Sequence, residues 1–223
     1  MRICTSQERG ILGYCKDLAK LQEILPHITS SNIIFASDGS HHRRLRHATG
    51  SWVISFQNGK LRSYRVSPVD GDLTSLNYFR DDLEAICSLL YWLRLLINVY
   101  SITRPSDWHV VIWIDNRTPL KYSKLDDFFK PNQHIGNESD IINDMFAVKT
   151  ELQISLRGKH VKSHQTVDRN VRAPLEVQLN EGCDAQGDDF LKILTGKMAL
   201  HPNSLHSRNR ESHPHHQGRS HHK

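Results

Sequence analysis

The chain has 223 residues, of which 38% are hydrophobic and 24% are charged, and its formal net charge is +5. This length suits one globular domain with tails, and the longest apolar run, around residues 86–93, is too short to span a bilayer. The four cysteines form neither a CxxC pair nor a regular framework, and the N-terminus lacks the apolar stretch of a signal peptide. We therefore expect an intracellular protein, cytoplasmic or nuclear, with reduced thiols and no membrane partner.

The positive charge is unevenly distributed. Residues 198–223 hold four Lys or Arg against one Glu, which is +3 and leaves about +2 (5 − 3) for the rest of the chain. The same segment holds seven of the fifteen histidines and hardly any apolar residues. We expect it to be a disordered tail, since it cannot bury enough apolar surface to offset ordering. The nearly neutral remainder can still bind nucleic acid through local basic patches.

The N-terminal part of the chain predicts one strand. Residues 1–31 carry only a weak helical pattern and are expected to be a linker or the remnant of an upstream region. The apolar run at residues 32–36 predicts a buried strand, and the turn-forming residues 37–40 are expected to end it. The polar and basic residues 41–49 then predict a loop.

A hairpin follows. Residues 52–56 and 61–66 predict two strands, because Asn58-Gly59 between them is a strong hairpin turn signal. The later elements are a helix over residues 76–100, a strand over 109–114, a helix over 139–152, a strand over 153–162 and a helix over 175–194. This order predicts an α/β domain over residues 32–197, with a mixed five-stranded sheet flanked by helices. The four tryptophans, Trp52, Trp92, Trp108 and Trp113, are expected in its core.

Two aspartates, Asp38 and Asp115, directly follow apolar strands. Singly, such an aspartate is most often a turn former or a helix cap. Ligand sites of α/β sheets gather at strand ends, so two neighbouring strands would bring both carboxylates to a shared metal ion. Two-metal phosphodiester chemistry needs three or four carboxylates. Further candidates lie in two predicted helices: Asp81, Asp82, Glu84, Asp184, Asp188 and Asp189.

Five short segments match the motifs of one family in the same order. They are S-D-G-S at 37–40, R-D-D-L-E-A at 80–85, W-I-D-N at 113–116, H-V-K-S-H-Q at 160–165 and L-N-E-G-C-D at 179–184. They resemble T/S-D-G-S, R-A-E-L-x-A/G, S-D-N/S, V-K-G-H-Q and L-N-x-x-A-D of ribonuclease H domains. This family is carried by retrotransposon reverse transcriptases and has related cellular ribonucleases H.

The resemblance covers residues 32–195 and implies a ribonuclease H-like fold and a set of site residues. The implied catalytic residues are Asp38, Asp82, Asp115, Asp184 and His164, of which the four aspartates would hold two magnesium ions, with manganese as a substitute. The implied substrate-binding or supporting residues are Ser40, Asn116, Asn180, Arg43 and Arg44. The implied activity is hydrolysis of the RNA strand of RNA–DNA hybrids, with an upstream reverse transcriptase domain as a partner.

Two positions depart from the family pattern. The helix motif normally carries Glu where this chain has Asp82, which is one methylene shorter. Glu84 is the alternative ligand, but it lies about 200° further round the helix, so both cannot face the same site. Ser163 replaces a glycine beside His164 and restricts the backbone of that loop. Both changes are compatible with weakened activity.

Two other functions remain open. Asp115 and Glu151 have thirty-five residues between them, the spacing of the retroviral integrase triad, and predict a DNA strand-transfer enzyme. That alternative leaves three of the matched segments unexplained. The second is a non-catalytic nucleic-acid-binding remnant that has the fold without the metal chemistry.

Overall fold

Five strands form one mixed sheet in the computed structural model. The strands are β1 (Ile34–His42), β2 (His47–Phe56), β3 (Leu61–Pro68), β4 (His109–Ile114) and β5 (Ser155–His160). Their order is β3-β2-β1-β4-β5. β1 and β2, and β2 and β3, pair antiparallel, whereas β4 is parallel to both β1 and β5. The predicted mixed sheet of five strands flanked by helices, which the ribonuclease H-like resemblance implied, is therefore confirmed.

The structure describes residues 23–28, 34–42, 47–56, 59–69, 78–103, 108–117, 138–162 and 173–196. Several predictions fall outside these ranges: those for the first 22 residues, Arg43, Arg44, Ser163, His164 and the tail.

β1 is longer than the sequence predicted. It continues past residue 36 to His42, and its last residues pair with the start of β2, from Gly39 opposite Gly50 to His42 opposite His47. The expectation that residues 37–40 end the strand was wrong, because ladder hydrogen bonds to β2 outweigh the turn preference of these small polar residues. Asp38 consequently lies inside a strand.

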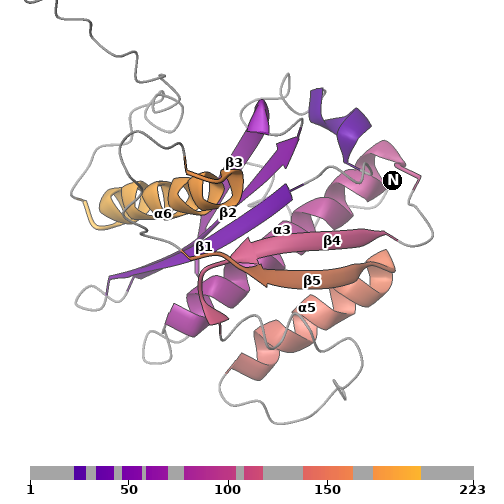
Figure 1. Cartoon of the computed structure of the whole chain (residues 1–223). Coiled ribbons are helices and arrows are strands. Elements are labelled where there is room, and N and C mark those ends of the chain that lie inside the picture. The colour runs from indigo at the N-terminus through magenta and orange to yellow at the C-terminus, as the bar shows by residue number, and fades with distance from the viewer. Residues whose placement is uncertain are drawn as a thin grey trace, which may run out of the picture.

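Three long helices cover the two faces of the sheet. Helix α3 (Tyr78–Tyr100) and helix α5 (Ser139–Leu152) lie on one face, and helix α6 (Leu175–Leu194) lies on the other, as Figure 1 shows. α3 packs on β1 and β2 and against α5, whereas α6 packs on β1, β2 and β3. β4 and β5 therefore have helices on one side and, in the described part of the chain, little contact with α6 on the other.

Most of the buried apolar surface lies on the α3 and α5 side. It includes the inward side chains of the sheet, such as Phe35, Trp52 and Ile54, packed against the stripe of α3 that contains Leu83, Ile86 and Leu90. The core on the α6 side is much smaller and consists of Ala36, Val53, Leu179 and Cys183. Trp113, which was expected in the core, is half-buried at the edge of this smaller cluster.

α3 is long and apolar enough to cross a membrane, but 61% of its most apolar window is buried within the protein. It packs on the sheet and on α5, as the central helix of a globular core does. A short 3-10 helix, η1 (Leu25–His27), precedes the sheet, and its neighbours Ile24 and Ile28 are buried in the large core. Residues 24 and 28, which precede the expected domain boundary at residue 32, thus pack in the same core.

Candidate metal centre at the acidic cluster

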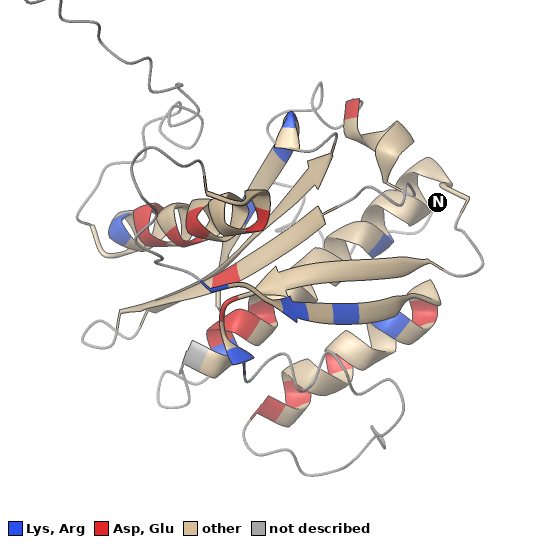
Figure 2. Cartoon of the chain, in the orientation of Figure 1, with Lys and Arg blue, Asp and Glu red and all other residues tan. Residues whose placement is uncertain are grey.

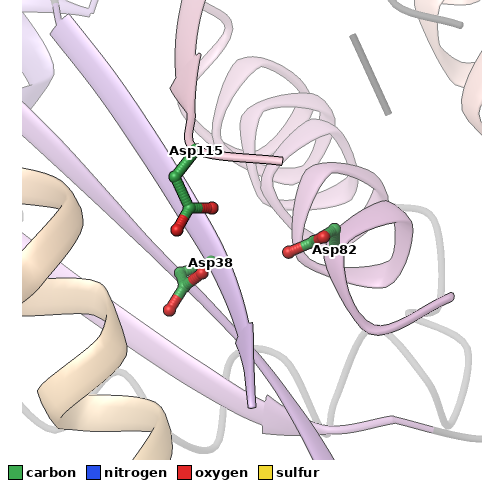
Figure 3. A group of neighbouring side chains, drawn as sticks. All are labelled: Asp38, Asp82 and Asp115. Atoms are coloured by element: carbon green, nitrogen blue, oxygen red, sulfur yellow. The ribbon is translucent and has the colours of Figure 1, made fainter. Parts of the chain in front are cut away.

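Three carboxylates from separate parts of the chain meet beside the sheet. Asp38 lies in β1, Asp82 in the first turns of α3, and Asp115 directly after β4. One oxygen of each lies within 4.8 Å of the others. Figure 3 shows the three side chains directed into the same space between β1, the end of β4 and α3. We call this group the acidic cluster.

The register of the sheet brings Asp38 and Asp115 together. β1 and β4 are parallel neighbours, with Phe35 opposite Ile112 and Ala36 opposite Trp113. Continuing this register by two residues places Asp38 beside Asp115, on the same side of the sheet because side chains alternate along a strand. The apolar residues in the first half of each strand are buried, and this burial fixes the register.

Two glycines bring Asp82 to the same place. Gly39 and Gly50 are paired across β1 and β2, and α3 lies directly on their backbone. A Cβ on Gly39 would lie 2.6 Å from the Cβ of Asp81 and 2.8 Å from the backbone nitrogen of Asp82. A Cβ on Gly50 would lie 2.9 Å from the backbone nitrogen of Ala85. Only glycines allow α3 to approach the sheet this closely. We call the pair Gly39 and Gly50 the glycine seat.

Asp82, and not Glu84, belongs to the acidic cluster. Asp82 is 3% exposed and accepts a hydrogen bond of 2.7 Å from the side-chain amide of Asn116. Glu84 lies 3.9 Å from the guanidinium of Arg80, which is also bound by both carboxylate oxygens of Asp140. The helical geometry that separated the two acids in the sequence therefore separates them in the structure. Asn116 orients Asp82, which fits the supporting role considered for it.

The buried carboxylates destabilise one another's charged forms. Burial and the charges of Asp115, Asp82 and Asp184 raise the pKa of Asp38 from 3.8 to about 9. Burial and Asp115 raise the pKa of Asp82 to about 7, against the hydrogen bond from Asn116. The backbone N–H of Gly39 favours the ionised form of both groups. An arrangement of this kind is costly unless a cation accompanies it.

Three further described residues of the predicted site, Asp184 and Asn180 of α6 and Ser40 of β1, lie at different depths. Asp184 is half-buried and close enough for its charge to raise the pKa of Asp38, but its oxygens are not among those within 4.8 Å of one another. Asn180 is 1% exposed and donates a 3.2 Å hydrogen bond to the carbonyl of Ser37. Ser40 is buried against Gly187. Both side chains are buried in this structure, and for Asn180 the hydrogen bond to Ser37 fits the supporting role that was one of its two expected roles.

A set of hydrogen bonds that the sequence did not predict joins α6 to the cluster. The Ser51 hydroxyl lies 2.8 Å from the carbonyl of Cys183 on α6 and 3.1 Å from the carbonyl of Asp38. The Thr49 hydroxyl donates to the carbonyl of Gly187 at 3.2 Å. These serine and threonine side chains look like ordinary strand residues in the sequence, and only the pairing of β1 with β2 shows that they support Asp38.

The complete burial of Asp81 is the feature of the site that departs most from what its sequence position suggests. A charge on the first turn of a helix is usually solvated, but Asp81 is 0% exposed, and one of its oxygens lies 3.3 Å from Nδ1 of His41. Burial and the neighbouring Asp82 raise its pKa to about 8. Asp81 faces the glycine seat, so its position follows from the close approach of α3. No feature of the sequence marks it as buried.

The cluster has the donor set of a hard divalent cation. All of its ligand atoms are carboxylate oxygens, with neither a histidine nor a cysteine in the group. Magnesium and manganese prefer such oxygens, whereas zinc sites usually include nitrogen or sulfur. A divalent cation would also offset the mutual repulsion that raises the pKa of Asp38 and Asp82. The residues present therefore fit magnesium or manganese.

Glu151, the candidate third acid of an integrase triad, is not in the acidic cluster. It lies on the last turn of α5 and pairs with Arg94 at 3.3 Å. The spacing of Asp115 and Glu151 is thus not accompanied by convergence of their carboxylates.

Comparisons with known proteins find matches among solved structures alone. No family model matches the chain, and no curated protein matches it. Among solved structures, the chain is similar to LC11-RNase H1, crystallised in complex with an RNA/DNA hybrid, with 14% sequence identity and a TM-score of 0.48. This match covers 71% of the present chain and 99% of the other. The order and pairing of the five strands define the fold.

Proposed function

We propose that the chain is a metal-dependent endonuclease of the ribonuclease H type, which hydrolyses the RNA strand of RNA–DNA hybrids. The observation that supports it best is the convergence of Asp38 in β1, Asp82 in α3 and Asp115 directly after β4, with one oxygen of each within 4.8 Å of the others. These aspartates also lie in the segments that resemble the motifs of this family. The origin that we propose is a retrotransposon reverse transcriptase, whose polymerase domain would precede this one.

Asp38, Asp82 and Asp115 would hold magnesium or manganese, with Asp184 of α6 as a fourth ligand. Bound there, the metal would lower the pKa of an attacking water and neutralise charge on the leaving oxygen. The residues of the chain hold the carboxylates in place: Asn116 orients Asp82 through its hydrogen bond, and Asn180 and Ser51 hold the backbone on either side of Asp38. This fixed geometry is what a closely spaced metal pair requires.

Hydrolysis breaks the bond between phosphorus and the 3′ oxygen, leaving a 3′-hydroxyl and a 5′-phosphate. The water gives its oxygen to the phosphate, and its protons go to the leaving 3′ oxygen and to solvent. We assign His164 to assisting this proton transfer or product release, and Arg43 and Arg44 to backbone contacts, on the resemblance alone. Selection of RNA requires contacts to the 2′-hydroxyl.

The activity is tested with purified protein, magnesium, a labelled RNA–DNA hybrid and a DNA duplex of the same sequence. We expect cleavage of the RNA strand of the hybrid alone, abolished by Asp115→Asn. Asp144→Asn, which removes an exposed carboxylate on α5, should cleave as the wild type does. Cleavage that persists in Asp115→Asn would contradict the proposal.

The non-catalytic remnant is the second candidate, because Asp82 is shorter than the glutamate of the family pattern. It predicts binding of the hybrid without cleavage in either magnesium or manganese. Joining of DNA ends would instead support strand transfer, which the position of Glu151 on α5 disfavours.

A further inference from the structure

One side of strands β4 and β5 carries basic and aromatic side chains, and within the described ranges no helix packs over it. On this side of β5 the exposed residues are Arg157 and Lys159, which lie opposite Val111 and Trp113 of β4. Figure 1 shows this side turned away from α3 and α5, with α6 over the other half of the sheet. We call Arg157, Lys159 and Trp113 the basic strip.

The charge of the basic strip contrasts with that of α6. β4 and β5 contain no Asp or Glu, whereas α6 carries five carboxylates against one lysine: Glu176, Glu181, Asp184, Asp188, Asp189 and Lys192. Figure 2 shows the acidic residues along α6 and the basic ones along β5, on either side of the acidic cluster. A polyanion approaching the cluster is repelled over α6 and attracted over β5.

The basic strip is also continuous with the acidic cluster. Trp113 of β4 precedes Asp115 by two residues, and Lys159 is the partner of Trp113 across the ladder. The ammonium of Lys159 lies 5.2 Å from the centre of the Trp113 ring, which places a cation and an aromatic surface together. Arg157 lies two residues further from the cluster, about 7 Å along the strand.

We propose that the basic strip binds the backbone of the nucleic acid whose phosphodiester reaches the acidic cluster. This inference rests on the proposed function and names a binding subsite for it. Arg157 and Lys159 contact phosphates of one strand, and the Trp113 ring lies against a sugar or base. Because three carboxylates repel a phosphate, binding energy must come from cations placed beside them, and these two lie on the adjoining strand.

The test uses a double variant, Arg157→Ala with Lys159→Ala, in the full chain that also carries Asp115→Asn, so that bound hybrid stays intact. The dissociation constant for a labelled RNA–DNA hybrid is measured in magnesium over a range of salt concentrations. Loss of two phosphate contacts should reduce the slope of log K against log salt by about 2. Both side chains are exposed, so the melting temperature should not change.

Two control variants remove or keep the same charge. Lys60→Ala with Lys149→Ala removes two positive charges from the β2–β3 turn and from α5, and should leave the slope unchanged. Arg157→Lys with Lys159→Arg keeps both charges on β5 and should also leave the slope unchanged. Equal slopes in the alanine variant and its parent would overturn the proposal, as would a parent that binds no hybrid.

Other outcomes separate this inference from the proposed activity. A wild type that binds hybrid through the basic strip but never cleaves it would refute the activity and keep the subsite. If the wild type cleaves the hybrid and the alanine variant has the same KM and salt slope, the activity is supported and the subsite is refuted. Self-association of the alanine variant with unchanged binding would show that these cations protect an edge strand, and would overturn the subsite.

Discussion

The two faces of the sheet are packed by different kinds of interaction. On the α3 and α5 face, large apolar side chains such as Phe35, Trp52 and Ile54 fill a continuous core. On the α6 face the apolar cluster is small, and Ser51 and Thr49 of β2 donate hydrogen bonds to helix carbonyls. Asn180 of α6 donates in return to the strand carbonyl of Ser37. The first face supplies most of the hydrophobic stabilisation, whereas the second fixes the position of the backbone around Asp38.

The largest expected effect is on the free energy of unfolding. It comes from truncating one of two neighbouring β2 residues that face opposite sides of the sheet. Ile54 lies in the large core and Val53 in the small one, and both are fully buried. Ile54→Ala should lower the free energy of unfolding by about 2–5 kcal/mol. Val53→Ala should cost less, because it removes fewer atoms from a smaller cluster. Denaturant unfolding measures both, and an equal or larger loss for Val53→Ala would break the comparison.

Substitution by alanine should destabilise the protein more at Gly39 of the glycine seat than at Gly187 of α6. Gly39→Ala forces a Cβ against helix backbone, so we expect a loss of about 1–3 kcal/mol and weaker metal binding as Asp82 moves from Asp38. Gly187→Ala is the matched control, since its Cβ would meet the Ser40 hydroxyl, which can rotate away. Calorimetry of unfolding and of magnesium binding tests the pair, and an intact metal affinity in Gly39→Ala would contradict the role of the seat.

Prediction from the sequence succeeded for some elements of the sheet and its helices and failed for others. β4 and α6 were predicted at their observed bounds, because their apolar periodicity is strong and clear signals limit them. The continuation of β1 through Gly39 was missed, since small polar residues favour turns unless a partner strand pairs with them. The seat itself depends on the pairing of Gly39 with Gly50, a contact between distant segments that no local pattern encodes.

The candidate site was predicted in the same uneven way. The segments around Asp38, Asp82 and Asp115 could be identified because each combines an acid with a distinctive local context. The burial of Asp81, and of Asn180 and Ser40, could not, because it depends on how closely α3 and α6 approach the sheet.

Asp38→Asn should raise stability when divalent cations are absent. The pKa of Asp38 is raised to about 9 on folding, so the folded state holds this proton more tightly than the unfolded state. Its stabilising contribution is complete below pH 3.8 and is lost as the pH rises through about 9. In EDTA at pH 8 we expect the variant to melt at least about 2–4 °C higher, the effect of ~1 kcal/mol in a domain of this size.

The same variant sharpens the contrast between charge and packing. Magnesium should stabilise the wild type and not the variant. The difference between their melting temperatures should therefore become smaller or change sign. A variant that melts at or below the wild type in EDTA at pH 8 would show that the Asp38 carboxylate is not under charge repulsion.

The smallest expected effect is that of a single hydrogen bond on the α6 face. Ser51→Ala removes the hydroxyl between α6 and the Asp38 carbonyl and should cost about 0.5–1.5 kcal/mol. Ser88→Ala is a control on the other face, where the hydroxyl accepts a 3.2 Å hydrogen bond from the Trp52 indole. Both should lose similar stability, but only Ser51→Ala should weaken magnesium binding. Equal metal affinities would remove the distinction between the two faces.

Magnesium binding to Asp82→Asn and Glu84→Gln tests the central claim most directly. Both variants remove one carboxylate charge from the same helix, two residues apart, but only Asp82 lies in the acidic cluster. Titration calorimetry should show that Asp82→Asn weakens magnesium binding at least ~10-fold and that Glu84→Gln leaves it unchanged. A wild type that binds no magnesium, or an Asp82→Asn variant with the affinity of the wild type, would contradict the assignment of this cluster as a metal centre.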